Sequence, residues 1–141
     1  MPRNENVGVG VAVILFREGD GKVPMSRRLM DRETWQWPGG WVDDGESPVT
    51  AAARELQEEA GIEIMEDDLV LIMADAVASV MYPGTWVITL FYTACLPAGV
   101  VMQRAEPDKS GPWEFFAPDD LPSPQFYPNY ADALRAATNA Y

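Results

Sequence analysis

Three glutamates that could hold a metal ion lie close together in the chain: Glu55, Glu58 and Glu59. An α-helix turns about 100° per residue, which places Glu58 and Glu59 within about a sixth of a turn on either side of Glu55. Like charges at these spacings destabilise a helix by roughly 0.2–0.5 kcal/mol per pair. Carboxylate oxygens suit Mg²⁺, Mn²⁺ or Ca²⁺ better than zinc. The pattern therefore favours a hard divalent cation site, with a solvated acidic face as the alternative.

The residues around these glutamates predict the helix that positions them. Ser47 suits the N-cap and Pro48 the first helical position, while Gly61 is a natural left-handed stop. Ala51 and Ala52 flank the acidic face, where we expect them to leave room for a bulky group. A second, apolar face should pack on a sheet; it consists of Val49, Ala53, Leu56 and Ala60.

Strands are expected before and after this helix. Their predicted ranges are 7–16, 22–28, 35–37, 69–81, 86–96 and 113–116. Pro38-Gly39-Gly40 should form a turn, residues 118–128 a loop, and residues 129–140 a second helix capped by Asn129. This order predicts an α/β sandwich with helices packed on a mixed sheet. The 141 residues suffice for one compact domain, 1–141, and are too few for two.

The composition excludes several classes of function. The chain has no histidine, which excludes Ser-His-Asp and Cys-His catalysis and histidine-ligated zinc. Its single cysteine, Cys95, lies in an apolar run and is expected to be buried, and a cytoplasmic location is expected because no internal disulfide can form. No apolar run reaches the ~20 residues that cross a membrane. The net charge of -12 argues against stable nucleic-acid binding.

The glutamates are part of a longer pattern, Gly40-x5-Glu46-x7-Arg54-Glu55-Leu56-x-Glu58-Glu59-x-Gly61-Ile62. It matches the Nudix box, G-x5-E-x7-R-E-U-x-E-E-x-G-U, at every specified position. The chain thus resembles the Nudix hydrolases, and in particular the small MutT-like nucleoside triphosphate pyrophosphatases. The latter resemblance also rests on segments 7–11, 26–28, 35–40, 106–109, 113–116 and 120–122. It implies a Nudix-type α/β/α sandwich, in which the box helix and a C-terminal helix pack on a mixed β-sheet.

The resemblance also implies a set of metal ligands and catalytic groups. Mg²⁺, or Mn²⁺ as its substitute, would be bound by the Gly39 carbonyl and by acidic side chains, namely Glu55, Glu58, Glu59 and, from a late loop, Glu106. Glu55 would bind the metal directly or through water, or would orient or deprotonate the attacking water. Arg54 would fix the Glu55 carboxylate by a charge-assisted hydrogen bond, and Glu46 would brace the loop. For Glu106, a solvated loop acid is an equal alternative.

Further residues are implied on the substrate side. In the MutT-like subgroup an arginine on the second strand contacts phosphate, which points to Arg28, or to Arg27 in its place. Gly39 and Gly40 are also expected to contact the substrate. Several aromatic side chains have two interpretations each, since they could pack in the protein or lie against a nucleobase: Trp35, Trp37, Tyr82 and Trp86. Core packing is favoured for Trp37.

The implied reaction is hydrolysis of a nucleotide small-molecule substrate, a (d)NTP that yields a (d)NMP and pyrophosphate. NDP-sugars and ADP-ribose are alternative substrates, although ADP-ribose hydrolases have a proline where this chain has residues 77–79. Tyr82 only loosely fits the tyrosine of dinucleoside polyphosphatases. A catalytically silent nucleotide-binding regulator is an alternative of another class, but such proteins lose box carboxylates that this chain keeps. The resemblance is compatible with a homodimer.

Overall fold

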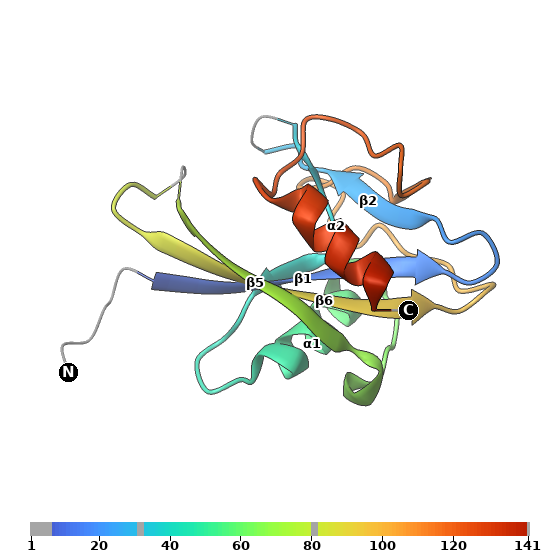
Figure 1. Cartoon of the computed structure of the whole chain (residues 1–141), viewed down its shortest axis with the longest axis horizontal. Coiled ribbons are helices and arrows are strands. Elements are labelled where there is room, and N and C mark those ends of the chain that lie inside the picture. Colours follow the sequence, from blue (N-terminus) through green and yellow to red (C-terminus); the bar gives the residue numbers. More distant parts are fainter. Residues whose placement is uncertain (1–6, 31–32, 80–81, 141) are drawn as a thin grey trace.

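The protein is described by a computed structural model, which covers residues 7–30, 33–79 and 82–140. Figure 1 shows its strands and helices in sequence colours. The strands are β1 (Val7–Arg17), β2 (Val23–Arg27), β3 (Trp35–Gln36), β4 (Gly39–Trp41), β5 (Val70–Ala78), β6 (Trp86–Leu96) and β7 (Glu114–Phe116). The helices are α1 (Pro48–Ala60), the 3₁₀ helix η1 (Glu66–Asp68) and α2 (Tyr130–Asn139). None of the helices in the described ranges is long and apolar enough to cross a membrane.

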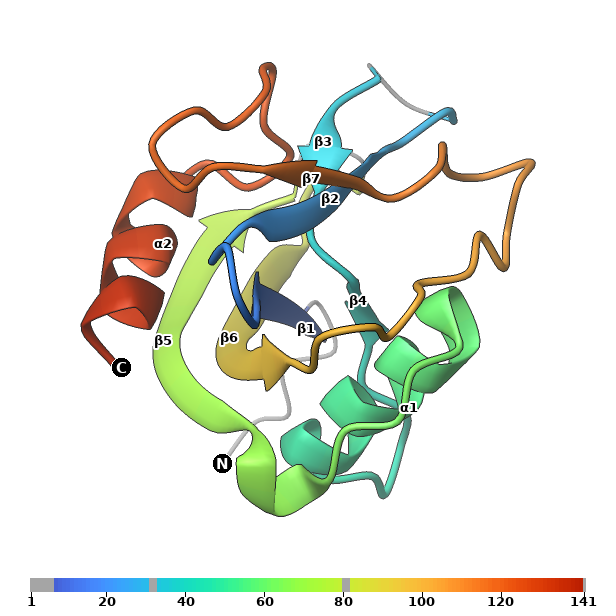
Figure 2. The same ribbon diagram turned by 90° about the vertical axis from the view of Figure 1, so that its right-hand side faces the viewer.

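Two sheets form the centre of the fold. The larger has the strand order β4-β1-β6-β5, and the smaller has the order β3-β2-β7. Strands β1 and β6 pair in parallel over their whole length, whereas β4 and β5 are antiparallel to their neighbours. In Figure 2, α1 lies on one side of β1 and β6, and the small sheet lies on the other with α2 beside β5. The α/β sandwich with a mixed sheet expected from the sequence is confirmed.

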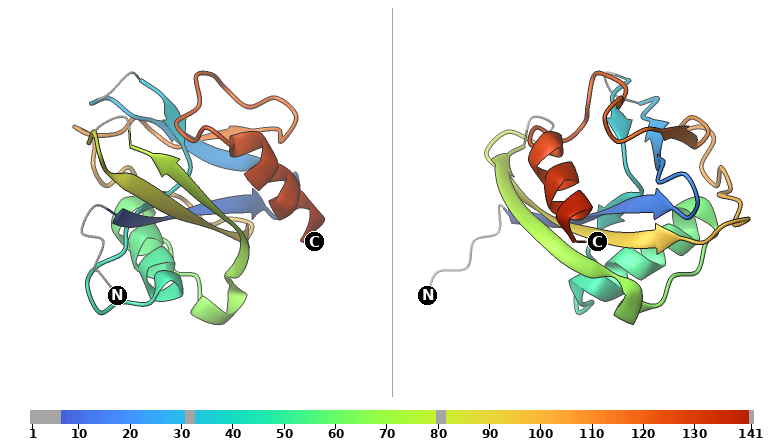
Figure 3. Two further views of the ribbon diagram at one scale, coloured as in Figure 1. Left: turned by 60° about the vertical axis from the view of Figure 1, so that its left-hand side comes forward. Right: turned by 45° about the vertical axis from the view of Figure 1, so that its right-hand side comes forward.

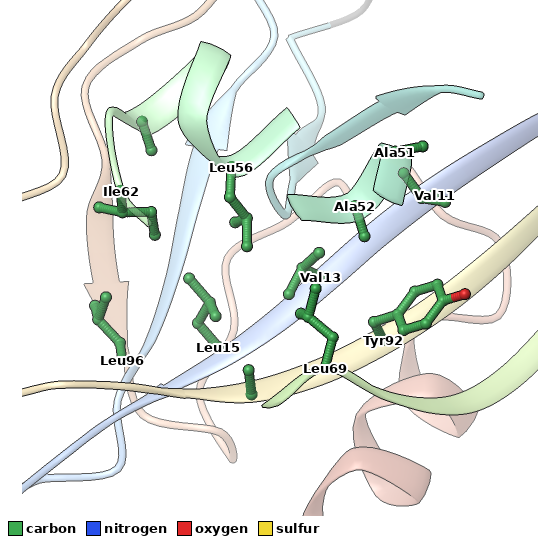
Figure 4. Packing of buried hydrophobic residues seen from close by; sticks show 12 residues of the cluster. Val11, Val13, Leu15, Ala51, Ala52, Leu56, Ile62, Leu69, Tyr92 and Leu96 are labelled. Carbon is green, nitrogen blue, oxygen red and sulfur yellow. The ribbon is translucent and has the colours of Figure 1, made fainter. Parts of the chain in front are cut away.

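Strand β1 is apolar along most of its length because both of its faces are covered. Val11, Val13 and Leu15 point toward α1 and form one core with Leu56, as Figure 4 shows. Ala12 and Ile14 point to the opposite face and form a second core, which includes residues of β2 and α2. The two views in Figure 3 show the helices on opposite sides of the large sheet. Consecutive residues of one strand thus hold both layers together.

Helix α1 begins and ends where the sequence predicts. The Ser47 hydroxyl accepts a hydrogen bond from the Thr50 amide at 3.3 Å, and Gly61 adopts the left-handed conformation with φ of 65°. The expectation for Ala51 and Ala52 was wrong, because both are fully buried in the core under the helix. Their small side chains allow α1 to pack closely on β1 and β4, and they leave no space for a ligand.

Trp37 and Cys95 were both predicted to be buried. Trp37 is fully buried, stacked against Tyr127 at 5.1 Å between ring centroids, which confirms the core interpretation. Trp35 is partly buried, and its ring meets Phe116 edge-on. The prediction for Cys95 was wrong, because this thiol is exposed. Its neighbour Ala94 points into the core beneath α1, so strand alternation turns Cys95 to the other face of β6.

Three local predictions also differ from the structure. Gly39 and Gly40 do not form a turn but begin β4, which pairs with β1. Asn129 stands at the predicted N-cap position of α2, but its side chain makes no capping hydrogen bond, and its amide instead donates to Asp75 of β5 at 2.5 Å. Strand β5 ends at Ala78, and the expected continuation at positions 80 and 81 lies outside the described residues. In the first two cases a contact with a residue of another strand takes the place of the expected local interaction.

Candidate active site

The acidic face of α1 lies against the backbone of the edge strand β4. The Gly39 amide donates a hydrogen bond to Glu59 Oε2 at 3.3 Å. A β-carbon placed on Gly40 would overlap the carboxyl group of Glu55, so this side chain fits only because residue 40 has none of its own. The missing side chain of Gly40 therefore lets the Glu55 carboxylate lie against the strand backbone, and the neighbouring Gly39 amide binds Glu59.

Arg54 connects the carboxylates of the site to the preceding loop. Its Nη1 donates to Glu55 Oε1 at 3.0 Å and to Glu58 Oε2 at 3.1 Å. Its Nε donates to Glu46 Oε2 at 2.7 Å, and Nη2 donates to Glu46 Oε1 and to the Trp41 carbonyl, each at 2.9 Å. The expected Arg54–Glu55 contact is present, and the pairing with Glu46 also holds loop and helix together.

The surroundings of Glu55 and Glu59 disfavour the ionised form of both carboxyl groups. Burial is the main cause that raises the pKa of Glu55 to about 7, with repulsion from Glu58 adding to it and Arg54 opposing it. Burial likewise raises the pKa of Glu59 to about 8, and the Glu55 charge raises it further. In contrast, the Arg54 guanidinium lowers the pKa of Glu46. Glu55 and Glu59 thus form a partly buried acidic pair that a cation would stabilise.

A long loop brings Glu106 to this pair. The Gln103 amide donates to the Ala60 carbonyl at 2.8 Å, and the Ala105 amide donates to the Glu59 carbonyl at 3.4 Å. The loop therefore satisfies carbonyl groups that the end of α1 leaves without helical partners. Repulsion from Glu106 contributes to the raised pKa values of both Glu55 and Glu59, so the three carboxylates are electrostatic neighbours.

The side chains present fit a hard cation by donor type. As they lie, no three acidic or cysteine side chains among the described residues converge closely enough to enclose a metal ion. One reason is that Nη1 of Arg54 is bonded to both Glu55 and Glu58. The Glu58 side chain is 55% exposed and can turn away from Arg54, whereas that of Glu55 is 12% exposed. A partly buried pair of carboxylates with raised pKa values, beside a more exposed third, suits a divalent cation with oxygen ligands.

A cavity of about 630 Å³ opens beside these carboxylates. This volume is in the range of sites that bind small molecules. Arg28 lies in its wall, where the guanidinium donates to Gln36 Oε1 at 2.8 Å and lies 4.1 Å above the Phe126 ring. Arg27 is exposed and does not line the cavity. The residues predicted from the sequence that do line it are Arg28, Gly39, Gly40, Glu59, Tyr82 and Glu106.

Several other residues that line the cavity were not predicted from the sequence. They include Met30, Trp41, Arg104, Lys109 and Phe126. Only Trp41 had a usable signal, since it directly follows the glycines of the acidic motif. The others lie on loops far apart in the chain. Trp86, by contrast, does not line the cavity, although it had been paired with Tyr82 as a candidate.

Comparisons with known proteins agree with this geometry. The family model described as NUDIX domain matches residues 7–137. The RNA pyrophosphohydrolase of Rhodospirillum rubrum is 50% identical over 54 residues, which are 38% of this chain and 31% of that protein. A MutT-like protein of Streptomyces ambofaciens is 31% identical over 113 residues, 80% of this chain and 66% of that protein. The crystal structure of a MutT NUDIX hydrolase from Burkholderia pseudomallei has a TM-score of 0.78 at 27% identity, covering 94% of this chain and 98% of that chain.

Proposed function

Because this chain belongs to the Nudix family, we propose that it is a divalent-metal-dependent pyrophosphohydrolase that converts a (d)NTP and water into a (d)NMP and pyrophosphate. The observation that carries the proposal is that Glu59 and Glu106 line a cavity large enough for a nucleotide, with Glu55 as an electrostatic neighbour of both. The likeness to the Burkholderia MutT NUDIX hydrolase over nearly the full length of both chains supports a MutT-like hydrolase.

The residues of the site have separable tasks in this reaction. When bound, Mg²⁺ (or Mn²⁺) neutralises phosphate charge and lowers the pKa of a coordinated water. Glu58, Glu59 and Glu106 would hold the cation, with the Gly39 carbonyl. Glu55, which the Gly40 backbone and Arg54 keep in one position, would accept the proton of the water that attacks phosphorus. The P–O bond to the departing group then breaks, and the electron pair leaves on that oxygen.

Arg28 is the proposed phosphate contact. Its guanidinium is already positioned by Gln36 and by the ring of Phe126, so little side-chain entropy is lost when a phosphate oxygen binds. In an acidic protein such a contact, together with the cation, offsets the repulsion between the protein and a polyanionic substrate. Arg27 lacks this placement, and we therefore assign the contact to Arg28 alone.

A second substrate is favoured by one of the comparisons. The relative from Rhodospirillum rubrum bears the name RNA pyrophosphohydrolase, which makes the 5′-triphosphate end of RNA an alternative for this chain. The aligned segment covers only 38% of the chain, however. A net charge of -12 also disfavours the many phosphates of an RNA strand. We rank a free nucleoside triphosphate first for these reasons.

A substrate panel tests the proposal directly. Purified protein with Mg²⁺ is incubated with canonical and oxidised dNTPs, NTPs, NDP-sugars, ADP-ribose and a 5′-triphosphorylated oligoribonucleotide, and pyrophosphate and phosphate are measured separately. We expect pyrophosphate from a nucleoside triphosphate, and no product when EDTA replaces Mg²⁺. Turnover that survives EDTA would contradict the metal requirement. Faster turnover of the oligoribonucleotide or of ADP-ribose would make that compound the substrate in place of a nucleoside triphosphate. Binding without turnover of any compound would favour the catalytically silent regulator.

A further inference from the structure

We propose that Trp41 forms the nucleobase-binding platform of this protein, with its indole ring stacked on the base of the bound nucleotide. The inference rests on the proposed nucleotide substrate, and it assigns the residue that binds the end of that substrate remote from the bond that breaks. The position of Trp41, the surface around it and its connection to the acidic helix each support the assignment.

Trp41 is a large apolar side chain that remains half exposed at the cavity. Its exposed fraction is 50%, and three other cavity residues also expose apolar surface: Met30 at 72%, Tyr82 at 56% and Phe126 at 37%. Burying such surface against an apolar ligand is favourable, and exposed apolar patches at a cavity are typical of ligand sites. The flat aromatic part of a nucleotide fits this wall, whereas its phosphates fit the carboxylate and arginine end.

The backbone of β1 supports the indole ring from one side. A β-carbon on Gly8 would lie 2.7 Å from Cζ3 and 3.2 Å from Cη2 of Trp41, so the ring rests where a side chain would otherwise stand. Gly10, which is paired with Trp41 in the sheet, also lines the cavity. Glycine within a strand is otherwise destabilising. These two glycines make room for the ring on one side, and its exposed surface remains available on the other.

Trp41 also adjoins the residues that contact the catalytic carboxylates. It directly follows Gly39 and Gly40, whose backbone meets Glu59 and Glu55, and consecutive Cα atoms are about 3.8 Å apart. Strand alternation turns position 40 toward α1 and Trp41 toward the opposite face. A nucleotide could therefore place its phosphates at the edge of β4 and its base across the strand on Trp41.

The ring is held firmly relative to the acidic helix. The Trp41 carbonyl accepts a hydrogen bond from Nη2 of Arg54 at 2.9 Å, so the arginine that orders Glu55 also fixes the backbone of Trp41. The aromatic alternative Phe126 is already covered by the Arg28 guanidinium at 4.1 Å and meets Tyr127 edge-on. Compared with Phe126, Trp41 thus exposes more of its ring, and its backbone is bonded to the arginine of the acidic helix.

The chain offers a matched control in Trp86. Its exposed fraction, 51%, is nearly that of Trp41, but it does not line the cavity. Its neighbour Val87 does line the cavity, and alternation along β6 therefore turns Trp86 to the other face of the sheet. Removing either indole deletes a similar exposed ring, and only the removal of Trp41 should affect the ligand.

The test measures binding without relying on turnover. We would determine the Kd of α,β-imido analogues of the four dNTPs by calorimetry with Mg²⁺ for the wild type, Trp41→Ala, Trp41→Phe and Trp86→Ala, and the Kd of inorganic tripolyphosphate in parallel. Trp41→Ala should raise the nucleotide Kd by about 5-fold to 100-fold. Trp41→Phe should retain most of the affinity, and Trp86→Ala should match the wild type. The Kd of tripolyphosphate, which has no base, should stay the same in all four proteins.

A further variant acts on the support of the ring. Gly8→Ala should push the Trp41 ring away and weaken nucleotide binding without weakening tripolyphosphate binding. An unchanged nucleotide Kd in Trp41→Ala, an equal loss in Trp86→Ala, a parallel loss for tripolyphosphate, or no nucleotide binding by the wild type would overturn the inference. Nucleotide binding that depends on Trp41 without hydrolysis would leave the inference standing and defeat the proposed function. Hydrolysis of a nucleoside triphosphate by the wild type, together with an unchanged nucleotide Kd in Trp41→Ala, would support the proposed function and overturn the inference.

Discussion

The carboxylate of Glu55 lies directly against the backbone of Gly40, in the space that a β-carbon at position 40 would take. This contact joins the first residue of the acidic motif to a glutamate on the helix that follows. It explains why the motif begins with glycine. The glycine is needed for space on the side that faces α1, and φ at this position is not in the left-handed region that only glycine readily adopts.

The first prediction compares alanine at the two neighbouring glycines. Gly40→Ala should displace the flexible Glu55 side chain and lower kcat about 10²-fold or more, with little change in thermal stability. Gly39→Ala should instead lower the melting temperature, because its β-carbon would overlap the Val11 carbonyl in the backbone of β1. Steady-state kinetics and thermal unfolding of both variants check this. A stable, fully active Gly40→Ala would contradict the proposed role of the contact.

The second prediction concerns Glu59 as a metal ligand. Glu59→Gln should reduce kcat by about 10²- to 10³-fold, equivalent to ~3–4 kcal/mol of lost transition-state stabilisation, because it removes a charged oxygen ligand. Glu63→Gln is the matched control, since Glu63 is an exposed glutamate just beyond the helix. Both variants are measured at saturating Mg²⁺ with the best substrate. Turnover of Glu59→Gln equal to that of Glu63→Gln would remove Glu59 from the catalytic set.

The third prediction concerns the stability of the metal-free protein. Burial raises the pKa of Glu59 to about 8 from an ordinary value of 4.5. A carboxyl group with a raised folded-state pKa stabilises the fold below the unfolded-state value, and this contribution is lost as the pH rises through the folded-state value. The free energy of unfolding in EDTA should therefore fall between pH 5 and pH 8. The fall is about 1.4 kcal/mol for each unit by which the folded-state pKa of Glu59 exceeds its unfolded-state pKa.

Glu59→Gln provides the check on that pH dependence. This variant cannot lose the proton, so its free energy of unfolding should fall less steeply over the same range and should exceed that of the wild type at pH 8. Urea unfolding at several pH values in EDTA measures both curves. Asp20, whose pKa is lowered to about 2 chiefly by Arg17, titrates outside this range and does not interfere. Equal slopes for the two proteins would show that Glu59 is not the source.

The fourth prediction separates two neighbouring arginines. Arg28→Ala should raise KM for the nucleotide by about 10-fold or more, because it removes a charge-assisted hydrogen bond from the cavity wall. Arg27→Ala should leave KM within about twofold, since this side chain is exposed outside the cavity. Initial-rate kinetics over a range of substrate concentrations give both constants. The opposite ranking of the two arginines would assign the phosphate contact to Arg27.

Much of the catalytic helix could be read from the sequence because its determinants are local. The helical period alone places Glu55, Glu58 and Glu59 together, and Ser47 and Gly61 mark its ends by chemistry that involves only near neighbours. The same holds for β1, whose continuous apolar residues from Val11 to Phe16 indicate a strand covered on both faces. These features depend on interactions over a few residues, which a linear pattern records directly.

The remaining parts of the site were decided by tertiary packing. Glu106 reaches the acidic pair because its loop bonds to the end of α1, and no spacing in the sequence encodes that contact. Likewise, alternation along a strand places the side chains of Cys95 and Trp41 on one face of the large sheet or the other. Only the packing of helices and strands on the two faces decides which of these side chains are covered. The sequence by itself thus determined the acidic helix and indicated hydrolysis of a phosphoanhydride bond. Tertiary structure decided what surrounds them, since long-range contacts bring together segments whose local signals carry no information about one another.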